Sequence, residues 1–533
     1  MDNSEPLILT VDFGTQSVRA AIFDKHGEVL AMEKKKYDPP YYSTMPNYAE
    51  QDPELYWSCL CEVTHRLMEN SGGLLKQVKG MCVTCFRDSA VLLDKDMKVI
   101  RPMILWLDQR TAECMNKLPF IDRAIFSLVG KYETVQSNRR RSMPNWFIEN
   151  EPENWARVYK YVNVSTWFIY RLSGDLKDSS SNYTGHYPLD FKNRRFYKNP
   201  EKNLTAQIFS LKSSMLCELV PEGSLMTHIS EEGSKATGLP VGLPIYAAGS
   251  DKACETLGLG VIDDHHAAVS YGTASSIETT RTKYTESEPF LPGYPACIPN
   301  LYNMEIQVYR GYWMINWFMK EFGGLPIKGA TITGAKIEDF NKKLPTIPPG
   351  SDGLVLQPYW GPSLSRPFAK GAIIGFSDSI TNEHFYRAII EGIAYALREG
   401  MEHFEKKNHR DIKEVRVSGG GSQSDEICQI TADIFNRPIS RVQTFENSSL
   451  GAAIAGFMAI GEYKDVKTAV SSMVRVKDTF VPHKDDQEKY DYLYKHVYHR
   501  MYPRLRFIYA DIKAFNRSEE KKTWAKKNSK KVQ

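Results

Sequence analysis

A strand–turn–strand pattern built around a Gly-Thr pair occurs twice in this sequence, and no other feature constrains the fold as strongly. The first copy spans residues 7–24, turns at Gly14-Thr15 and continues into a short apolar run at 28–31, which is typical of a β-meander. The second copy spans residues 267–278 and turns at Gly272-Thr273. The copies lie roughly half the folded body apart, so the sequence predicts an internal duplication of one domain type.

The length of the chain fits such a duplication. Its 533 residues exceed the ~250–300 that a single hydrophobic core normally holds. The main boundary is predicted between Pro244 and Asp251, which gives an N-terminal domain of residues 1–247 and a C-terminal domain of residues 248–480. A helical extension at 481–514 and a basic, disordered tail at 515–533 are predicted to follow.

Composition and charge exclude several classes of protein. The chain is 42% apolar and 25% charged, which is ordinary for a soluble globular protein and excludes a disordered chain or a collagen-like fibre. The formal net charge is +4, and residues 515–533 alone carry seven basic and two acidic side chains. The tail's net charge of +5 leaves −1 for the rest of the chain, so no nucleic-acid partner is expected.

Cysteine usage and the N-terminal residues predict a cytoplasmic protein. Nine scattered cysteines favour reduced thiols over a disulfide framework. Cys82 and Cys85 form a CxxC motif that could be a zinc or redox element, but the strand-like run around them places the two on opposite faces and favours buried thiols. No signal peptide is expected, and the longest run of small and apolar residues, eleven at 450–460, is too short to cross a membrane.

Apolar spacing predicts several helices. The run 53–70 begins with proline and repeats apolar residues at helical intervals. The run 384–404 carries one apolar face, 425–435 follows a glycine-rich turn, and 449–460 is rich in Gly and Ala, so this last helix should pack closely.

The turn at residues 12–19 is the first of four elements with candidate chemistry. Its backbone N–H groups and the Thr15 hydroxyl can approach a phosphate, and Asp12 can hold Mg²⁺ through water. Arg19 can reach a transferring phosphoryl group. A plain hairpin turn is the alternative interpretation.

The other three elements lie between residues 248 and 422. Gly272-Thr273 can contact phosphates, and the side-chain-free run 418–422 offers a surface for an adenine ring, although a glycine triplet is also typical of a flexible loop. Asp251, after a glycine turn, can accept the proton of a substrate hydroxyl. The same residue type is also a preferred helix N-cap.

Taken in this order, the four elements resemble the FGGY family of carbohydrate kinases over roughly residues 7–474. One family signature is well kept at Gly371–Phe376, His384-Phe385 and Ala388–Glu391. The other, at 142–152, keeps its tryptophan and its Glu-Asn-Glu-Pro run but has Met143 in place of the usual lysine and Pro144 at a helical start. Residues 48–53 and 101–110 are also similar to family motifs.

The resemblance implies an α/β fold of two actin-like (ribonuclease H-like) ATPase domains, duplicated in type, around a central cleft that closes over ATP and substrate. It implies ATP and Mg²⁺ as cofactors, with Asp12 at the metal and Asp251 as the catalytic base. The implied ATP-binding residues are Asp12, Gly14, Thr15, Gln16, Arg19, Gly272, Thr273, Gly420, Gly421 and Ser422.

Arg87-Asp88, at the end of a strand, is where the resemblance places the sugar. An arginine can donate to vicinal hydroxyls and an aspartate can accept from them, although a structural ion pair is the alternative. The pair is similar to the Arg-Glu of glycerol kinases and of autoinducer-2 kinases. No tyrosine stands between Glu133 and Arg141 to close a glycerol pocket, and Lys252 stands where those kinases have glutamine, which argues against glycerol. Trp106 and Asp108 are predicted to wall the pocket, although a buried tryptophan is more often only a part of the core.

The sequence therefore predicts a kinase that phosphorylates a hydroxyl of a small sugar, ketose or polyol, with Arg87, Asp88, Trp106, Asp108, Asp251 and Lys252 at the acceptor. A kinase of a sugar-like signal molecule such as autoinducer-2 and a non-catalytic, actin-like ATP-binding sugar sensor remain as alternatives. No nucleic-acid or membrane partner is expected, and homodimerisation is left open.

Overall fold

A computed structural model describes residues 5–288, 291–323, 336–361, 363, 366 and 368–529, with side chains as far as 516. The chain forms two compact units. Unit 1 comprises Met1–Asp264, Thr279–Glu305 and Val442–Arg475, and unit 2 comprises His265–Glu278, Ile306–Arg441 and Val476–Gln533. Each unit is thus built from three separate segments of the chain.

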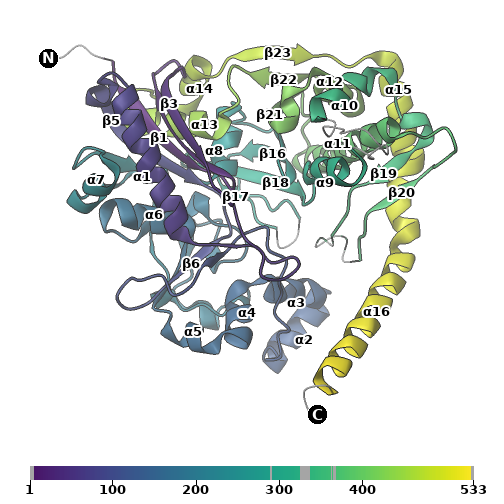
Figure 1. The fold of residues 1–533 in the computed structure, drawn as a ribbon, viewed down its shortest axis with the longest axis horizontal. Helices are drawn as coiled ribbons and strands as arrows, with labels where there is room; N and C mark the ends of the chain where they lie inside the picture. The colour runs from purple at the N-terminus through teal and green to yellow at the C-terminus, as the bar shows by residue number, and fades with distance from the viewer. Residues whose placement is uncertain are drawn as a thin grey trace, which may run out of the picture. The chain divides into compact units, whose positions relative to one another are not determined.

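The central sheet of unit 1 has six strands in the order β13-β14-β5-β1-β2-β3 (Figure 1). Their bounds are β1 Leu7–Phe13, β2 Ser17–Phe23, β3 Val29–Lys36, β5 Val78–Cys85, β13 Leu225–His228 and β14 Pro244–Tyr246. Strands β1, β2 and β3 form the antiparallel meander that the sequence predicts. Strand β5 lies parallel to both β1 and β14.

Both faces of this sheet are buried along β1, and alternate side chains of β1 point to opposite faces. Leu9 and Val11 pack with helices α1 (Pro53–Asn70) and α6 (Val164–Ser173), whereas Ile8 packs with α8 (Asp251–Gly258) and α13 (Asn447–Ala459). Cys85 belongs to the first cluster and Cys82 to the second. The structure therefore confirms that these two cysteines are buried on opposite faces of a strand.

Glycines allow α8 and α13 to pack in direct backbone contact. A Cβ at Gly258 would lie 2.0 Å from the carbonyl oxygen of Asn447, and one at Gly451 would lie 1.7 Å from that of Cys254. The close packing predicted for the Gly- and Ala-rich helix is confirmed, and its partners are α8 and, through Gly456, the side chains of Ile8 and Cys82.

The remaining elements of unit 1 surround the central sheet. A second sheet has the order β4-β7-β6-β8, with bounds β4 Glu50–Gln51, β6 Ala90–Leu93, β7 Met103–Ile104 and β8 Lys160–Asn163. The helices nearby are α2 Phe120–Leu128, α3 Tyr132–Arg141, α4 Met143–Asn150, α5 Pro152–Arg157 and α7 Glu231–Thr237, and α14 spans Val466–Met473. Pro144 lies in the first turn of α4, where its missing N–H has no helical partner to lose, so it starts the helix without breaking it.

Unit 2 repeats the construction of unit 1. Strand β15 (His266–Tyr271) pairs antiparallel with β16 (Ser275–Arg281) across the second Gly-Thr turn and parallel with β21 (Glu414–Gly419), as β1 pairs with β2 and β5. These strands belong to a seven-stranded sheet with the order β17-β18-β16-β15-β21-β22-β23, in which β17 spans Tyr294–Pro295, β18 Tyr302–Val308, β22 Ile439–Val442 and β23 Val476–Phe480. The predicted duplication is therefore present in the fold.

The helices of unit 2 are α9 Trp313–Phe322, α10 Ile337–Lys343, α11 Asn382–Asn408 and α12 Asp425–Phe435, and a two-stranded sheet pairs β19 Val355–Gln357 with β20 Ala372–Ile374. In α11 the predicted apolar face is buried, including Ile389, Ile393 and Leu397.

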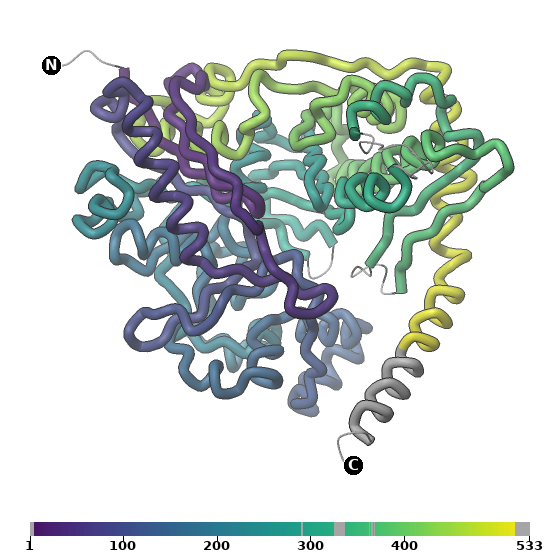
Figure 2. The backbone as a smooth tube through the Cα atoms, viewed as in Figure 1, coloured from purple at the N-terminus to yellow at the C-terminus, as the bar shows by residue number. Residues whose placement is uncertain are grey.

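The C-terminal segment of unit 2 is helical (Figure 2). Helix α15 (Lys484–Leu493) continues through a π-helical turn at Tyr494–Tyr498 into α16 (His499–Ser529). Tyr490, Tyr494 and Tyr498 are buried, and their rings lie 5.2–6.2 Å from that of Tyr395. Helix α16 includes part of the stretch from residue 515 for which the sequence predicts disorder, and residues 530–533 lie outside the described residues.

Candidate active site

Three parallel strands of unit 1, in the order β14-β5-β1, end at the same edge of the central sheet. The Gly14-Thr15 turn follows β1, Arg87-Asp88 follows β5, and Asp251 begins the helix that follows β14. Phe13 and Cys85, the last residues of β1 and β5, are register partners. The fold therefore gathers three predicted site elements from distant parts of the sequence at one sheet edge.

Asp12 lies at the end of β1 and is only 4% exposed. The Arg19 guanidinium, from the facing position on β2, lies 3.5 Å from the Asp12 carboxylate and forms a second, closer ion pair with Glu446. Burial raises the pKa of Asp12 to about 6, because loss of water outweighs the attraction of Arg19. Glu446 immediately precedes α13 and was not predicted from the sequence.

The Gly14-Thr15 turn is linked to the predicted acceptor wall. The N–H of Gly14 donates to the carbonyl of Ser17 at 3.0 Å, which closes the turn. The Trp106 indole donates to the Thr15 hydroxyl at 2.9 Å, and Ser89 accepts from the Trp106 backbone N–H at 3.0 Å. The neighbouring Gln16 side chain is exposed. Trp106 thus connects the predicted phosphate turn, through its indole, with the segment that carries Arg87-Asp88, through its backbone.

Arg87 and Asp88 face different partners. Arg87 donates to Glu305 at 2.8 Å, and its guanidinium lies 5.3 Å from the centre of the Tyr294 ring. Asp88 instead binds a histidine and a threonine of another segment. Arg87 thus forms an ion pair with Glu305, whereas Asp88 forms its hydrogen bonds with His186 and Thr184.

Asp108 holds a structural position. Its side chain is 1% exposed, and its two oxygens accept a two-pronged pair of hydrogen bonds from Arg110, at 2.9 and 2.8 Å. The backbone N–H of Ala49 donates to the same carboxylate at 2.6 Å. Contact of Asp108 with an acceptor stays a prediction, and both of its oxygens already have partners.

Asp251 is the first residue of α8, and Ser250, not Asp251, caps that helix by accepting from the N–H of Ala253. Gly249 has no room for a side chain, since a Cβ there would lie 2.6 Å from the Ser181 hydroxyl. Burial raises the pKa of Asp251, and the charges of Lys252 and Arg87 offset only part of that rise. A carboxylate whose pKa is raised in this way is a stronger base than an exposed aspartate.

Lys252 is directed to Glu255, one turn along α8, at 2.7 Å. The Asp251 carboxylate accepts the backbone N–H of Lys252 at 2.8 Å. The predicted contact of the Lys252 side chain with an acceptor stays a prediction.

Two predicted nucleotide elements lie together in unit 2. Tyr271, which precedes the Gly272-Thr273 turn, is the register partner of Gly419, which precedes the Gly420–Ser422 turn. The carbonyls of Gly272 and Thr273 accept from the N–H groups of Tyr312 and Trp313, at 3.1 and 3.2 Å. Two adjacent parallel strands therefore place both turns at one sheet edge.

The glycine turn of unit 2 has one open and two enclosed positions. A Cβ at Gly420 would meet no atom within 4 Å, whereas one at Gly421 would lie 2.4 Å from the Tyr312 ring. Ser422 is fully buried and its hydroxyl closes the turn on the carbonyl of Gly419 at 2.7 Å. Gly420 is thus the position that presents bare backbone to solvent, as the predicted adenine surface requires.

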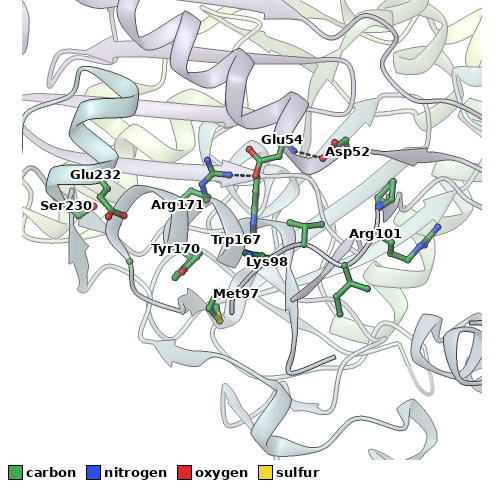
Figure 3. A pocket seen from close by; sticks show the side chains of 14 residues that line it. Asp52, Glu54, Met97, Lys98, Arg101, Trp167, Tyr170, Arg171, Ser230 and Glu232 are labelled. Carbon is green, nitrogen blue, oxygen red and sulfur yellow. Dashed lines mark hydrogen bonds and ion pairs between the residues drawn. The ribbon is translucent and has the colours of Figure 1, made fainter. Parts of the chain in front are cut away.

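Other polar features lie away from these residues. A cavity of about 670 Å³ in unit 1 is lined by Arg171, paired with Glu54, and by Trp167 and Lys98, and none of the predicted site residues lines it (Figure 3). Within the described part of the chain, no helix is both long enough and apolar enough to span a membrane.

The comparisons with known proteins show the family of the chain. Residues 7–258 match the N-terminal domain, and residues 267–460 the C-terminal domain, of the FGGY family of carbohydrate kinases. An uncharacterised sugar kinase of Escherichia coli, YgcE, is 29% identical over 93% of each chain, and the xylulose kinase of Lactococcus lactis is 25% identical over 96% of this chain and 99% of its own.

The fold also matches solved structures. The crystal structure of a ligand-bound xylulose kinase from Lactobacillus acidophilus superposes with a TM-score of 0.78 at 21% identity, covering 95% of this chain and 100% of that one.

The family match and the fold define a phosphotransferase with an alcohol group as acceptor, built as a two-domain actin-like ATPase. The chain belongs to the FGGY family of carbohydrate kinases. Kinases of this family use ATP, generally with a divalent metal ion.

Proposed function

We propose that this protein transfers the γ-phosphoryl group of ATP to a hydroxyl of a small, uncharged sugar, ketose or polyol. The observation that carries the proposal is Asp251, a carboxylate whose pKa is raised by burial, on the same sheet edge as Arg87-Asp88. Asp251 takes the proton of the acceptor hydroxyl, the oxygen attacks the γ-phosphorus, and ADP leaves.

The charges at Arg87 favour an uncharged acceptor. Its guanidinium is paired with Glu305, which is 3% exposed. A sugar acid at this position would bring a third carboxylate beside those of Glu305 and Asp88, which costs binding energy through like-charge repulsion. The hydroxyls of a neutral acceptor can instead accept from Arg87 and donate to Asp88.

Mg²⁺ fits the residues around Asp12. The carboxylate is an oxygen ligand of the kind that Mg²⁺ prefers, and its raised pKa shows that Arg19 alone leaves its charge incompletely compensated. We infer that Asp12 holds the ion directly or through water. When bound, Mg²⁺ neutralises charge on the triphosphate.

The nucleotide is assigned to both turn elements. Gly14 and Thr15 are proposed to contact the phosphates, with Gln16 and Arg19 beside them. Gly272 and Thr273 are proposed as a further phosphate contact, and the exposed backbone at Gly420, flanked by Gly421 and Ser422, is proposed to face the adenine.

A coupled ADP-release assay tests the proposal. Polyols, ketopentoses, ketohexoses, deoxysugars and gluconate are screened with Mg·ATP, and ADP release is expected with one or more neutral acceptors and not with gluconate. EDTA should abolish it and Mg²⁺ restore it. Asp251→Asn should remove turnover while ATP still binds, and the exposed Asp96→Asn is the matched control with unchanged activity. ATP binding without ADP release for any acceptor would refute the kinase assignment.

A further inference from the structure

The aspartate of the acceptor pair is held in an unusual backbone conformation. Asp88 has φ +59°, in the left-handed region that residues other than glycine seldom adopt. Such a conformation costs energy, and it persists when surrounding contacts fix it. The contacts that fix the side chain of Asp88 come from residues 184 and 186.

Two side chains from one segment bind the two oxygens of this carboxylate. His186 Nδ1 lies 2.7 Å from Asp88 Oδ2, and the Thr184 hydroxyl donates to Oδ1 at 3.2 Å. Burial by itself raises the pKa of Asp88, but the charge of His186, the hydrogen bonds from His186 and Thr184 and the charge of Arg87 outweigh it, so the pKa lies below its ordinary value. The carboxylate is therefore kept ionised.

The segment that carries these two side chains is itself anchored. Tyr183 and Tyr187 flank Thr184 and His186 in the sequence, are 2% and 3% exposed, and pack edge to face with ring centres 4.8 Å apart. His186 is 29% exposed at its side chain and Asp88 32%, so their contact lies at the edge of solvent. A buried pair of tyrosines thus holds two polar side chains against Asp88.

We propose that His186 and Thr184 are positioning residues for the acceptor: by binding one oxygen each, they fix the Asp88 carboxylate so that its remaining lone pairs accept substrate hydroxyls. An ionised carboxylate accepts up to about four hydrogen bonds, so each oxygen keeps capacity for one hydroxyl. His186 donates through Nδ1–H, which both the neutral and the charged imidazole can supply. This inference rests on the proposed kinase function, in which Asp88 binds the acceptor.

Steady-state kinetics with the best neutral acceptor test this role. His186→Ala is expected to raise the acceptor KM about tenfold to a hundredfold, the usual effect of losing a hydrogen bond to a charged group, with the KM for ATP unchanged and kcat changed much less. Thr184→Val, which removes the longer bond without changing shape, should raise it about threefold to tenfold. His228→Ala, at an exposed histidine of β13, is the control with no effect.

A conservative variant separates positioning from folding. His186→Asn can place an amide N–H near the position of Nδ1, so it should recover most of the acceptor affinity lost in His186→Ala. An unchanged acceptor KM in His186→Ala, equal losses for acceptor and ATP, or no recovery in His186→Asn would overturn the inference while leaving the kinase assignment intact. A wild-type protein without acceptor-stimulated ADP release would overturn both.

Discussion

Replacing Asp12 by asparagine is expected to stabilise the folded protein while abolishing phosphoryl transfer. The wild-type carboxylate has a pKa of about 6 in the folded protein against 3.8 for an exposed aspartate. Because the folded state binds this proton more tightly than the unfolded state does, the stabilisation from the bound proton is full below pH 3.8 and is lost as the pH rises through about 6. Above that pH, ionised Asp12 therefore lowers the free energy of unfolding by about 3 kcal/mol relative to an uncharged side chain at this position.

Asparagine keeps the shape of the side chain and removes this cost. Arg19 keeps Glu446 as its partner, so the substitution leaves no isolated buried cation. The gain in unfolding free energy of Asp12→Asn over wild type should rise between about pH 4 and pH 6 and stay constant, near 3 kcal/mol, from pH 6.5 to 8. Urea unfolding, monitored by tryptophan fluorescence at four pH values, measures this gain in unfolding free energy.

A second buried aspartate provides the matched control. Asp108→Asn makes the same chemical change but breaks the two-pronged contact with Arg110, so it should lower the unfolding free energy by about 3 kcal/mol. Asp12→Asn that destabilises the protein at pH 8, or a gain that does not change between pH 4 and 6, would refute the argument that loss of water dominates at Asp12.

Three further substitutions test the packing and the site. Gly258→Ala should lower the unfolding free energy by about 1–3 kcal/mol in the same urea assay, since its Cβ would lie 2.0 Å from the carbonyl of Asn447. Gly420→Ala should leave stability unchanged, because its Cβ meets no protein atom, but should raise the KM for ATP severalfold, because the methyl group would occupy the proposed adenine surface. An unchanged KM for ATP would contradict the placement of adenine on this surface. Glu446→Gln should lower kcat about tenfold by loosening Arg19, measured by ADP release.

Local features of the fold were predictable because each depends on neighbouring residues. The predicted helix at 53–70 matches α1 residue for residue, since proline fixes its start and apolar spacing defines its length. The β-meander and both Gly-Thr turns follow from alternating apolar runs interrupted by a turn residue. The predicted Gly-Thr turns follow the ends of strands β1 and β15, which is where a turn between two strands must lie.

Partners distant in sequence could not be predicted. Glu446 is 427 residues from Arg19, Glu305 is 218 residues from Arg87, and His186 is 98 residues from Asp88. None of the three stands in a motif, because a single ion pair or hydrogen bond leaves no pattern along the chain. For Asp108 the sequence predicted a role that no contact among the described residues displays. Its motif predicted a position in the acceptor pocket, whereas its carboxylate oxygens accept hydrogen bonds from Arg110 and Ala49.

The composition of α13 explains how a residue near the end of the sequence reaches the Asp12 site. Gly451 brings the helix backbone against that of α8, and Gly456 brings it against Ile8 of β1 and Cys82 of β5. These contacts fix the helix relative to both the strand that carries Asp12 and the helix that carries Asp251. Glu446, at the start of α13, is consequently held opposite Arg19. The small residues that predicted close packing thus also position the Arg19–Glu446 ion pair beside Asp12, so changes at Gly451 or Gly456 should alter phosphate-site chemistry as well as stability.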